Sequence, residues 1–315
     1  MNESVLLLSL ASAVVIGTPI LLAGLGEMMT EHSGVMNLGI EGMLLGGGVV
    51  GFWMSTQQAS LPLAMAVGAL VGALFALIHA YLAVTLRVNQ IVSGLALVVT
   101  GTGFASFVGS LNDSALIYSR PVSKFEPVFG EAMRDLPLVG PLVLGHDWAV
   151  YMSWVLVAVA AFWLFRTRAG LAVRAVGEDP ATADTVGIPV GLTRYVYTMI
   201  GGAGAGMGGT YLMAGIFSTY QHGISAGLGW IAFALVIFAG WRPWRALVAA
   251  YVFGALRNLG FSLQIVGVDI PPDVLNMLPF FLTIVALMII SARPAAARKF
   301  SAPSALSVPY ARESR

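Results

Sequence analysis

Apolar residues dominate the chain in long runs that contain no Asp, Glu, Lys or Arg. The runs cover 4–26, 42–86, 88–112, 148–165, 195–241 and 274–292. Most of them reach the roughly 20 residues that an α-helix needs to cross a bilayer. The pattern therefore predicts an all-α protein that crosses a membrane several times.

Hydropathy divides these runs into nine predicted spans, at 4–26, 38–54, 61–86, 91–110, 148–165, 195–213, 228–241, 246–262 and 274–292. The segments 38–54 and 228–241 are short, interrupted by glycine and preceded by polar, glycine-bearing backbone. Such segments line polar cavities in transporters. We predict a transmembrane helical bundle of about 8–10 spans with one or two broken or re-entrant helices. The alternative is that both segments are short, tilted helices.

Composition supports a membrane protein and excludes other classes. Only 10% of the 315 residues are charged and 58% are hydrophobic, whereas a soluble domain carries roughly 25% charged residues. A net charge of +1 without a basic run gives no sign of nucleic-acid binding. The absence of Cys excludes disulfides and thiolate chemistry. Glycines spaced four apart, among them Gly68/Gly72 and Gly202/Gly206, favour close helix packing.

The charges in the predicted loops indicate the orientation, because short cytoplasmic loops are enriched in Lys and Arg. The segment 111–147 carries three basic and five acidic residues, and we place it in the periplasm. The segment 166–194 carries four basic and three acidic residues, and we place it in the cytoplasm together with a loop at 27–37. The transmembrane domain then covers 1–292. The tail, 293–315, is predicted to be cytoplasmic, with little order after Phe300.

The sequence contains no catalytic or nucleotide-binding motif in the context that such a motif requires. Gly204, Gly206 and Gly209 match G-x-G-x-x-G, but inside an uncharged span without a preceding strand. Neither Lys124 nor Lys299 follows a phosphate-binding glycine loop. The four histidines lack metal-ligand spacing. We therefore predict a chain that is not an enzyme and that binds no metal and no cofactor of its own.

Polar positions at the edges of spans are the candidates for a substrate pathway. Asn37 and Glu41 lie four residues apart, on one face if the segment is helical. The alternative is that Asn37 caps a helix and Glu41 favours the positive end of its dipole. Asn89 and Gln90 form a short polar turn. Arg257 either faces a polar cavity or extends to the membrane surface, and the second is favoured.

The segment 166–194 contains the signals for one short helix. Asp179 and Pro180 fit an N-cap followed by proline at the first helical position, and Gly187 fits the stop. A compact helix held between two spans is suited to dock on a partner and to pass a conformational change to the membrane part. The alternative is an ordinary surface helix.

Three segments carry a resemblance to a known family: Ser33-Gly-Val-Met-Asn-Leu-Gly-Ile-Glu-Gly42, Asn89-Gln-Ile-Val-Ser-Gly-Leu-Ala-Leu97 and Arg174-Ala-Val-Gly-Glu-Asp-Pro-Ala-Thr-Ala-Asp-Thr-Val-Gly-Ile188. Together they resemble the permease subunits of bacterial ABC importers in the branched-chain amino acid and ribose permease superfamily. The Asn-Leu-Gly-Ile-Glu-Gly form is similar to the nucleoside and simple-sugar branch.

The resemblance implies a multi-pass permease of the bacterial inner membrane that carries nucleosides or related purine and sugar compounds. The implied partners are a cytoplasmic ATPase that binds ATP and Mg, a second homologous permease, and a periplasmic or lipid-anchored substrate-binding protein. The implied contacts with the ATPase are Arg174, Gly177, Glu178, Asp179, Ala183 and Gly187. The alternatives are import of branched-chain amino acids or monosaccharides, an ion-coupled secondary transporter with Glu41 as the only carboxylate in the apolar segments, and a membrane scaffold.

Overall fold

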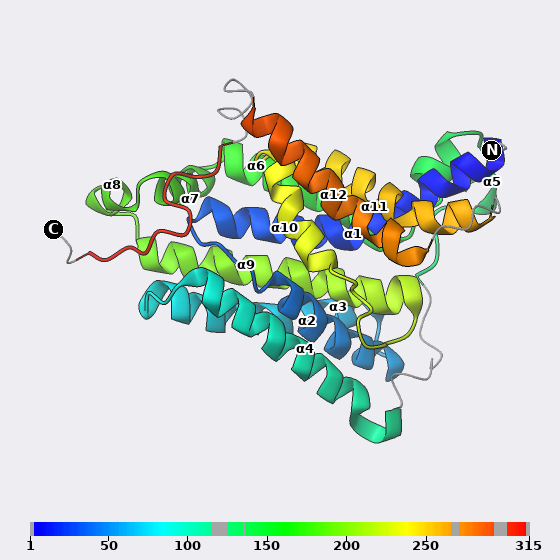
Figure 1. The fold of residues 1–315 in the computed structure, drawn as a ribbon, viewed down its shortest axis with the longest axis horizontal. Coiled ribbons are helices and arrows are strands. Elements are labelled where there is room, and N and C mark those ends of the chain that lie inside the picture. Colours follow the sequence, from blue (N-terminus) through cyan, green and yellow to red (C-terminus); the bar gives the residue numbers. More distant parts are fainter. Residues whose placement is uncertain (1–2, 115–124, 135, 266–270, 293–300, 313–315) are drawn as a thin grey trace.

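The computed structural model describes residues 3–114, 125–134, 136–265, 271–292 and 301–312. Helices make up most of this part of the chain, and it contains no β-sheet beyond an isolated bridge between Pro127 and Asp147. Figure 1 shows long helices side by side, most of them running along the longest dimension of the molecule. The predicted all-α class is confirmed.

The bundle is built from α1 (Glu3–His32), α2 (Ile40–Thr56), α3 (Leu61–Ala80), α4 (Gln90–Ser114), α6 (Trp148–Arg166), α9 (Val190–Thr210), α10 (Leu228–Ala239), α11 (Pro243–Ile265) and α12 (Pro272–Ser291). Each predicted span coincides with one of these helices. Two helices continue into π-helical turns, α3 into η1 (Tyr81–Thr85) and α9 into η3 (Tyr211–Phe217). The shorter elements are α5 (Glu131–Arg134), η2 (Gly140–Leu144), α7 (Arg168–Glu178) and α8 (Pro180–Thr185).

Several helices have the length and composition of membrane spans. Among the described residues, four stretches are long and apolar enough to cross a bilayer, namely Ser9–His32, Leu61–Thr85, Gln90–Leu111 and Trp148–Arg166, and Leu228–Ala239 is a shorter apolar helix. Most of their outward side chains are apolar, and Leu70 and Val99 are 60% and 74% exposed. Surfaces of this kind face lipid or another membrane subunit. The chain is a multi-pass membrane protein.

Glycines allow the central helices to touch. Helix α9 packs against α1, α2 and α3. A Cβ added to Gly47 would lie 2.6 Å from the Cα of Gly206, and one added to Gly72 would lie 2.1 Å from the carbonyl oxygen of Gly202. No side chain fits at either contact, so the predicted role of glycine in close helix packing is confirmed.

The first helix is longer than its predicted span. The prediction ends at residue 26 and assigns 27–37 to a loop, but α1 continues to His32 and buries Glu27 and Glu31. Both carboxylates have partners. Glu27 Oε1 accepts a hydrogen bond from the Asn37 N–H at 3.1 Å, and Glu31 Oε2 accepts one from the Trp241 indole at 2.6 Å. Glu41 is therefore not the only carboxylate in the apolar part of the chain.

The C-terminal segment also differs from its prediction. Ala305 is only 7% exposed, and its N–H donates to the Gly177 carbonyl oxygen at 2.9 Å. The Ser307 N–H donates to the Gly34 carbonyl oxygen at 3.1 Å. The expectation of little order after Phe300 is wrong for residues 301–312, because their backbone finds partners on other elements. The rest of the tail, 293–300 and 313–315, lies outside the described residues.

Candidate functional site

The connection between α1 and α2, residues 33–39, enters the bundle as non-helical backbone. Figure 1 shows it running from the end of α1 near α7 towards the middle of the molecule, where α2 begins. Ser33 and Asn37 are fully buried. Backbone polar groups in an apolar interior need partners within the protein. Side chains from four helices supply them.

Helices α3 and α4 hold Met36. Gln90 Oε1 accepts a hydrogen bond from the Met36 N–H at 2.8 Å, and His79 Nε2 lies 3.0 Å from the Met36 carbonyl oxygen. Because a carbonyl oxygen only accepts, Nε2 carries the proton in this contact. In the neutral ring, Nδ1 then accepts from the Ser93 hydroxyl at 2.7 Å. His79, Gln90 and Ser93 are all buried.

Helices α1 and α9 hold the rest of the segment. Glu27 of α1 accepts from the Asn37 N–H, as described above. Arg194 of α9 is 1% exposed, and its Nε donates to the Ser33 carbonyl oxygen at 3.2 Å. The Asn37 side chain closes the turn before α2, because its Oδ1 accepts from the Gly39 N–H at 3.1 Å. Leaving one such buried group unsatisfied costs about 1–3 kcal/mol, so these bonds keep the segment in one conformation.

The two short helices meet at their N-terminal ends through Glu41. Its Oε1 accepts from the Ser225 hydroxyl at 2.5 Å, and its Oε2 accepts from the Gly229 N–H at 2.6 Å. A Cβ added to Gly229 would lie 2.5 Å from the Glu41 Cα, so the first turns of α2 and α10 touch. The positive ends of two helix dipoles therefore converge on one carboxylate.

Both helices are short for a membrane span. Helix α2 has 17 residues and α10 has 12. At 1.5 Å per residue they measure about 26 and about 18 Å, less than the roughly 30 Å of a hydrocarbon core. Each follows a non-helical connection, as the sequence predicts. Short helices whose N-termini meet inside a bundle are the arrangement that transporters use around a substrate site.

Arg257 also belongs to this junction. The prediction favours an Arg257 side chain that extends to the membrane surface, but its Nη1 donates to the Ala226 carbonyl oxygen at 3.1 Å. Ala226 lies in the connection that leads into α10. Arg257 therefore holds the connection that leads to the Glu41 junction.

The structure brings three of the four predicted pathway residues together, namely Asn37, Glu41 and Gln90. Asn89 has a different task, because its exposed side chain caps α4. Its Oδ1 accepts from the N–H groups of Ile91 at 2.9 Å and Val92 at 3.2 Å. Asn37 and Glu41 do not share a helix face, since α2 begins at Ile40 and Asn37 precedes it.

Sequence reasoning missed five polar residues of the site. They are Glu27, His79, Ser93, Arg194 and Ser225. Each lies next to or within an apolar stretch, and only Ser93 belongs to one of the three segments that carry the family resemblance. The sequence offers one indication of their role, which is that a polar group buried in an apolar environment needs a hydrogen-bonding partner.

The segment 166–194 forms two helices, α7 and α8, where one is predicted. The predicted cap of α8 is present, because Asp179 Oδ1 accepts from the N–H groups of Ala181 and Thr182, both at 3.0 Å. The Thr182 hydroxyl donates to Asp179 Oδ2 at 2.5 Å. This hydroxyl, followed by the backbone N–H groups, holds the pKa of Asp179 below its usual range. Gly187, with a φ of +86°, stands where the helix ends.

The other predicted coupling residues hold this end of the molecule together. A Cβ added to Gly177 would lie 2.3 Å from the His32 carbonyl oxygen, so α7 touches the end of α1. Arg174 lies over the Phe165 ring at 5.1 Å. Ala183 is buried against α7 and the start of α9. The surface of α8 is left to Ala181, Thr182, Thr185 and Val186, all of them exposed.

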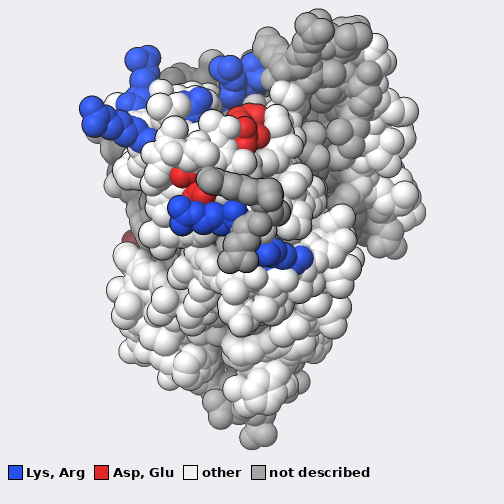
Figure 2. All heavy atoms as spheres, turned by 90° about the vertical axis from the view of Figure 1, so that its left-hand side faces the viewer, with Lys and Arg blue, Asp and Glu red and all other residues white. Residues whose placement is uncertain are grey.

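Basic side chains dominate the charge at the end of the molecule that carries α7, α8 and the C-terminal segment. Figure 2 looks onto this end and shows more Lys and Arg than Asp and Glu. Exposed basic residues near α7, α8 and the C-terminal segment are Arg166, Arg168, Arg242 and Arg312.

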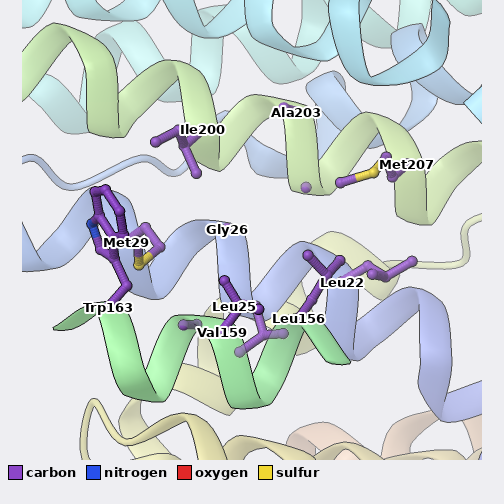
Figure 3. Close-up of a pocket in the computed structure, with 12 residues that line it drawn as sticks. Leu22, Leu25, Gly26, Met29, Leu156, Val159, Trp163, Ile200, Ala203 and Met207 are labelled. Carbon is purple, nitrogen blue, oxygen red and sulfur yellow. The ribbon is translucent and has the colours of Figure 1, made fainter. Parts of the chain in front are cut away.

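A separate apolar cavity of about 280 Å³ lies between α1, α6 and α9. Figure 3 shows aliphatic, aromatic and methionine side chains around it, among them Leu25, Met29, Val159, Trp163, Ile200 and Met207. The Trp163 indole N–H is already bonded to the Tyr197 hydroxyl at 2.9 Å. The cavity therefore offers no free polar group to a polar solute, and we do not assign it to the pathway.

Comparison with known proteins gives a consistent picture. Residues 9–287 match the family described as branched-chain amino acid transport system / permease component. The chain is 38% identical to the putative glucose ABC transporter permease protein TsgC13 of Haloferax volcanii, over 96% of this chain and 97% of that protein. It is 34% identical to the guanosine ABC transporter permease protein NupQ of Bacillus subtilis, over 96% of each chain.

A third relative is the nucleoside ABC transporter permease protein NupC of Lactococcus lactis subsp. cremoris, which is 30% identical over 88% of this chain and 90% of that protein. A second, more distant permease from each of these three organisms also matches, at 26%, 23% and 22% identity.

Proposed function

The chain belongs to the permease component family of branched-chain amino acid transport systems, and we propose that this ABC permease translocates nucleosides or related purine and sugar compounds across the cytoplasmic membrane. The observation that carries the substrate class is the position of Glu41. In transporters with broken helices, the N-termini of the half-helices bind anionic groups of the substrate. Here that place is taken by a carboxylate of the chain itself, which disfavours anionic solutes and favours neutral ones such as nucleosides and sugars.

Glu41 also argues against branched-chain amino acids, the first alternative. Their carboxylate would have to approach a buried carboxylate that two helix N-termini already bind. Monosaccharides are the second candidate substrate, because they are neutral and because the glucose permease named above shares 38% of its aligned residues with this chain.

A second homologous permease is the proposed partner within the membrane. Each of the three organisms compared above holds two permeases similar to this chain, which supports a pair. Helix α4 exposes Thr100, Thr102 and Ser110 on an otherwise apolar surface, and the Ser106 hydroxyl lies 3.2 Å from His222 Nδ1. We place these polar groups of α4 towards the partner permease.

A separate ATPase is the proposed source of energy. We place it against α8 and the basic end of the molecule, which becomes the cytoplasmic side together with the C-terminus. The opposite end, with the 111–147 loop, then receives substrate from a binding protein. ATP-driven closure of the ATPase would move α7 and α8 and shift the permease from an outward-facing to an inward-facing state.

The substrate proposal is tested with the partner binding protein. It is purified and titrated calorimetrically with nucleosides, nucleobases, glucose and leucine. We expect a nucleoside to bind at least tenfold more tightly than any other class. A preference for leucine would overturn the proposal, and a preference for glucose would establish the second candidate.

The energy source is tested in proteoliposomes that contain the complete transporter. Uptake should require ATP on the ATPase side and persist when a protonophore collapses the proton gradient. Uptake that survives without ATP and stops with the protonophore would instead support ion coupling through a buried carboxylate such as Glu27.

A further inference from the structure

The C-terminal segment lies across two parts of the molecule that the proposed function needs to connect. One part is the pair α7 and α8, where the ATPase is placed. The other is the non-helical segment 33–39, which leads to Glu41. Residues 301–312, which we call the strap, contact both parts. The match to the family model ends at residue 287, before the strap begins.

The strap is bonded to α7 and α8 on one side. The Ser304 hydroxyl and N–H donate to Glu178 Oε2 at 2.7 and 3.2 Å. The Ala305 N–H donates to the Gly177 carbonyl oxygen, as described above. Arg312 forms an ion pair with Asp184 of α8 at 3.1 Å, and Tyr310 packs against the buried cluster of Val176, Ala183 and Val190.

On its other side the strap is bonded to the start of the non-helical segment. The Ser307 N–H donates to the Gly34 carbonyl oxygen. Gly34 has a φ of +85°, and a Cβ there would lie 3.0 Å from Arg194 Nη2 and 3.2 Å from the Ala305 carbonyl oxygen. Only glycine therefore fits between the strap and the arginine without strain.

Arg194 joins the two sides. Its Nε donates to the Ser33 carbonyl oxygen at 3.2 Å, and its Nη1 donates to the Val308 carbonyl oxygen at 3.0 Å. One buried guanidinium thus bonds both the strap and the non-helical segment. The guanidinium of Arg194 is planar and donates in fixed directions. A displacement of the strap that moves the guanidinium therefore also moves or breaks its hydrogen bond to Ser33.

We propose that the strap and Arg194 position segment 33–39 relative to the ATPase-docking helices, and that they transmit the movement of α7 and α8 to the Glu41 junction. This inference rests on the proposed docking of the ATPase at α8. In this arrangement the strap moves with α7 and α8 as one unit, and Arg194 is a positioning residue without contact to substrate. Coupling of this kind requires an unbroken series of contacts between the two sites, made by elements that can adopt two arrangements.

The test uses the complete reconstituted transporter with both permeases, ATPase and binding protein. A stop codon at 301 removes the strap, and a stop codon at 313 is the matched control. Ala305→Phe overfills the buried contact beside Gly34, and Ala302→Phe changes an exposed neighbour. We expect the 301 truncation and Ala305→Phe to leave ATPase copurification and ATP hydrolysis within about twofold of wild type, and to lower substrate transported per ATP hydrolysed by at least fivefold.

Arg194→Gln should show the same loss, and Arg194→Lys should recover part of it, because lysine restores a donor but not the fork. Unchanged transport per ATP in the truncated and Ala305→Phe proteins would overturn the proposal. Loss of ATPase copurification would also overturn it, since the strap would then be part of the docking surface. A failure of the docking proposal is recognised separately, because Val186→Asp, at the exposed residue that follows α8, would then leave copurification intact.

A measurement on a chain with the strap in place keeps the proposal testable if the variants do not fold. The chain has no Cys, so spin labels can be attached at Val308→Cys on the strap and Leu171→Cys on α7, both exposed. We expect one narrow distance distribution that is the same with and without a non-hydrolysable ATP analogue. A distribution that changes with nucleotide would show that the strap and α7 move apart, and would overturn the proposal.

Discussion

The Glu41 carboxylate and the Ser225 hydroxyl, 184 residues apart in the sequence, lie 2.5 Å from each other. This bond joins the first turn of α2 to the connection that precedes α10. Glu41 also accepts from the Gly229 N–H, so a side chain of α2 satisfies a backbone donor in the first turn of α10. The junction therefore depends on the two acceptor oxygens of a carboxylate, whereas an amide has one acceptor oxygen and an NH2 group that donates.

Glu41→Gln is predicted to weaken this junction. The amide NH2 group would face either the Gly229 N–H, which only donates, or the Ser225 hydroxyl, which could accept from it but would then need another acceptor for its own proton. In either case one buried donor loses the oxygen that accepts from it. The expected cost is about 1–3 kcal/mol of folding free energy, with reduced uptake. Thermal unfolding in lipid nanodiscs measures the stability, with Glu41→Asp as the charge-conserving control. A Gln variant that unfolds at the wild-type temperature would mean that the carboxylate does not hold α10.

Gln90→Leu should destabilise the non-helical segment and lower uptake. It removes the acceptor of the buried Met36 N–H, which costs about 1–3 kcal/mol. The neighbouring Asn89→Asp is the matched control, because it keeps an oxygen that caps α4. Uptake by proteoliposomes measures both. Equal losses of uptake in the two variants would contradict the assignment of Gln90 to the non-helical segment and of Asn89 to the cap of α4.

Gly72→Ala is predicted to disrupt the packing of α3 on α9. The new Cβ would lie 2.1 Å from the Gly202 carbonyl oxygen, so the two backbones must separate. Overfilling of this kind costs about 1–3 kcal/mol. Gly103→Ala is the control, since no atom lies within 4 Å of its Cβ position. The unfolding temperature of the first variant should fall and that of the second should stay constant or rise slightly; the reverse order would refute the packing argument.

The cap of α8 should be insensitive to pH in the neutral range. The Thr182 hydroxyl holds the pKa of Asp179 below its usual range. The stabilisation is therefore fully present above the unfolded pKa of about 3.9, and it is lost only as the pH falls through the lower folded pKa. Hydrogen–deuterium exchange of α8 should be protected to the same degree, after correction for intrinsic rates, from pH 8 to about pH 5.

Asp179→Ala should remove that protection at every pH, because the capping oxygen is absent. Thr182→Val is the complementary variant. It keeps the cap but raises the pKa of Asp179 towards its ordinary value. An α8 that loosens between pH 7 and pH 6 in the unmodified protein would show that another group controls the helix.

Local patterns explain which parts of this structure could be predicted. Apolar runs mark the nine helices of the described bundle, and the cap at Asp179 with the stop at Gly187 marks α8. Both signals can be recognised because they lie within the sequence segment that forms the helix. Arg194 shows the limit, because it counts as an ordinary loop charge in the sequence. Its burial depends on carbonyl oxygens of Ser33 and Val308, which are 161 and 114 residues away.

The prediction of little order in the strap fails for the same reason. Its Pro, Ser and Ala composition is typical of a flexible tail, and no local pattern reveals that Gly34 and Gly177 offer it hydrogen-bonding partners. Glu27 was assigned to a loop because a charge usually ends an apolar span. The structure keeps it helical, since the N–H of Asn37 satisfies one of its oxygens.

The shared carboxylate at the start of α2 and α10 also restricts how the two helices can move. Sliding either helix along its axis by one turn would shift its first N–H groups by about 5.4 Å and break the bonds to Glu41. Tilting about the junction leaves these bonds intact. A permease built in this way is expected to change its access by a rocking motion with Glu41 as the pivot, in which the far ends of α2 and α10 travel furthest.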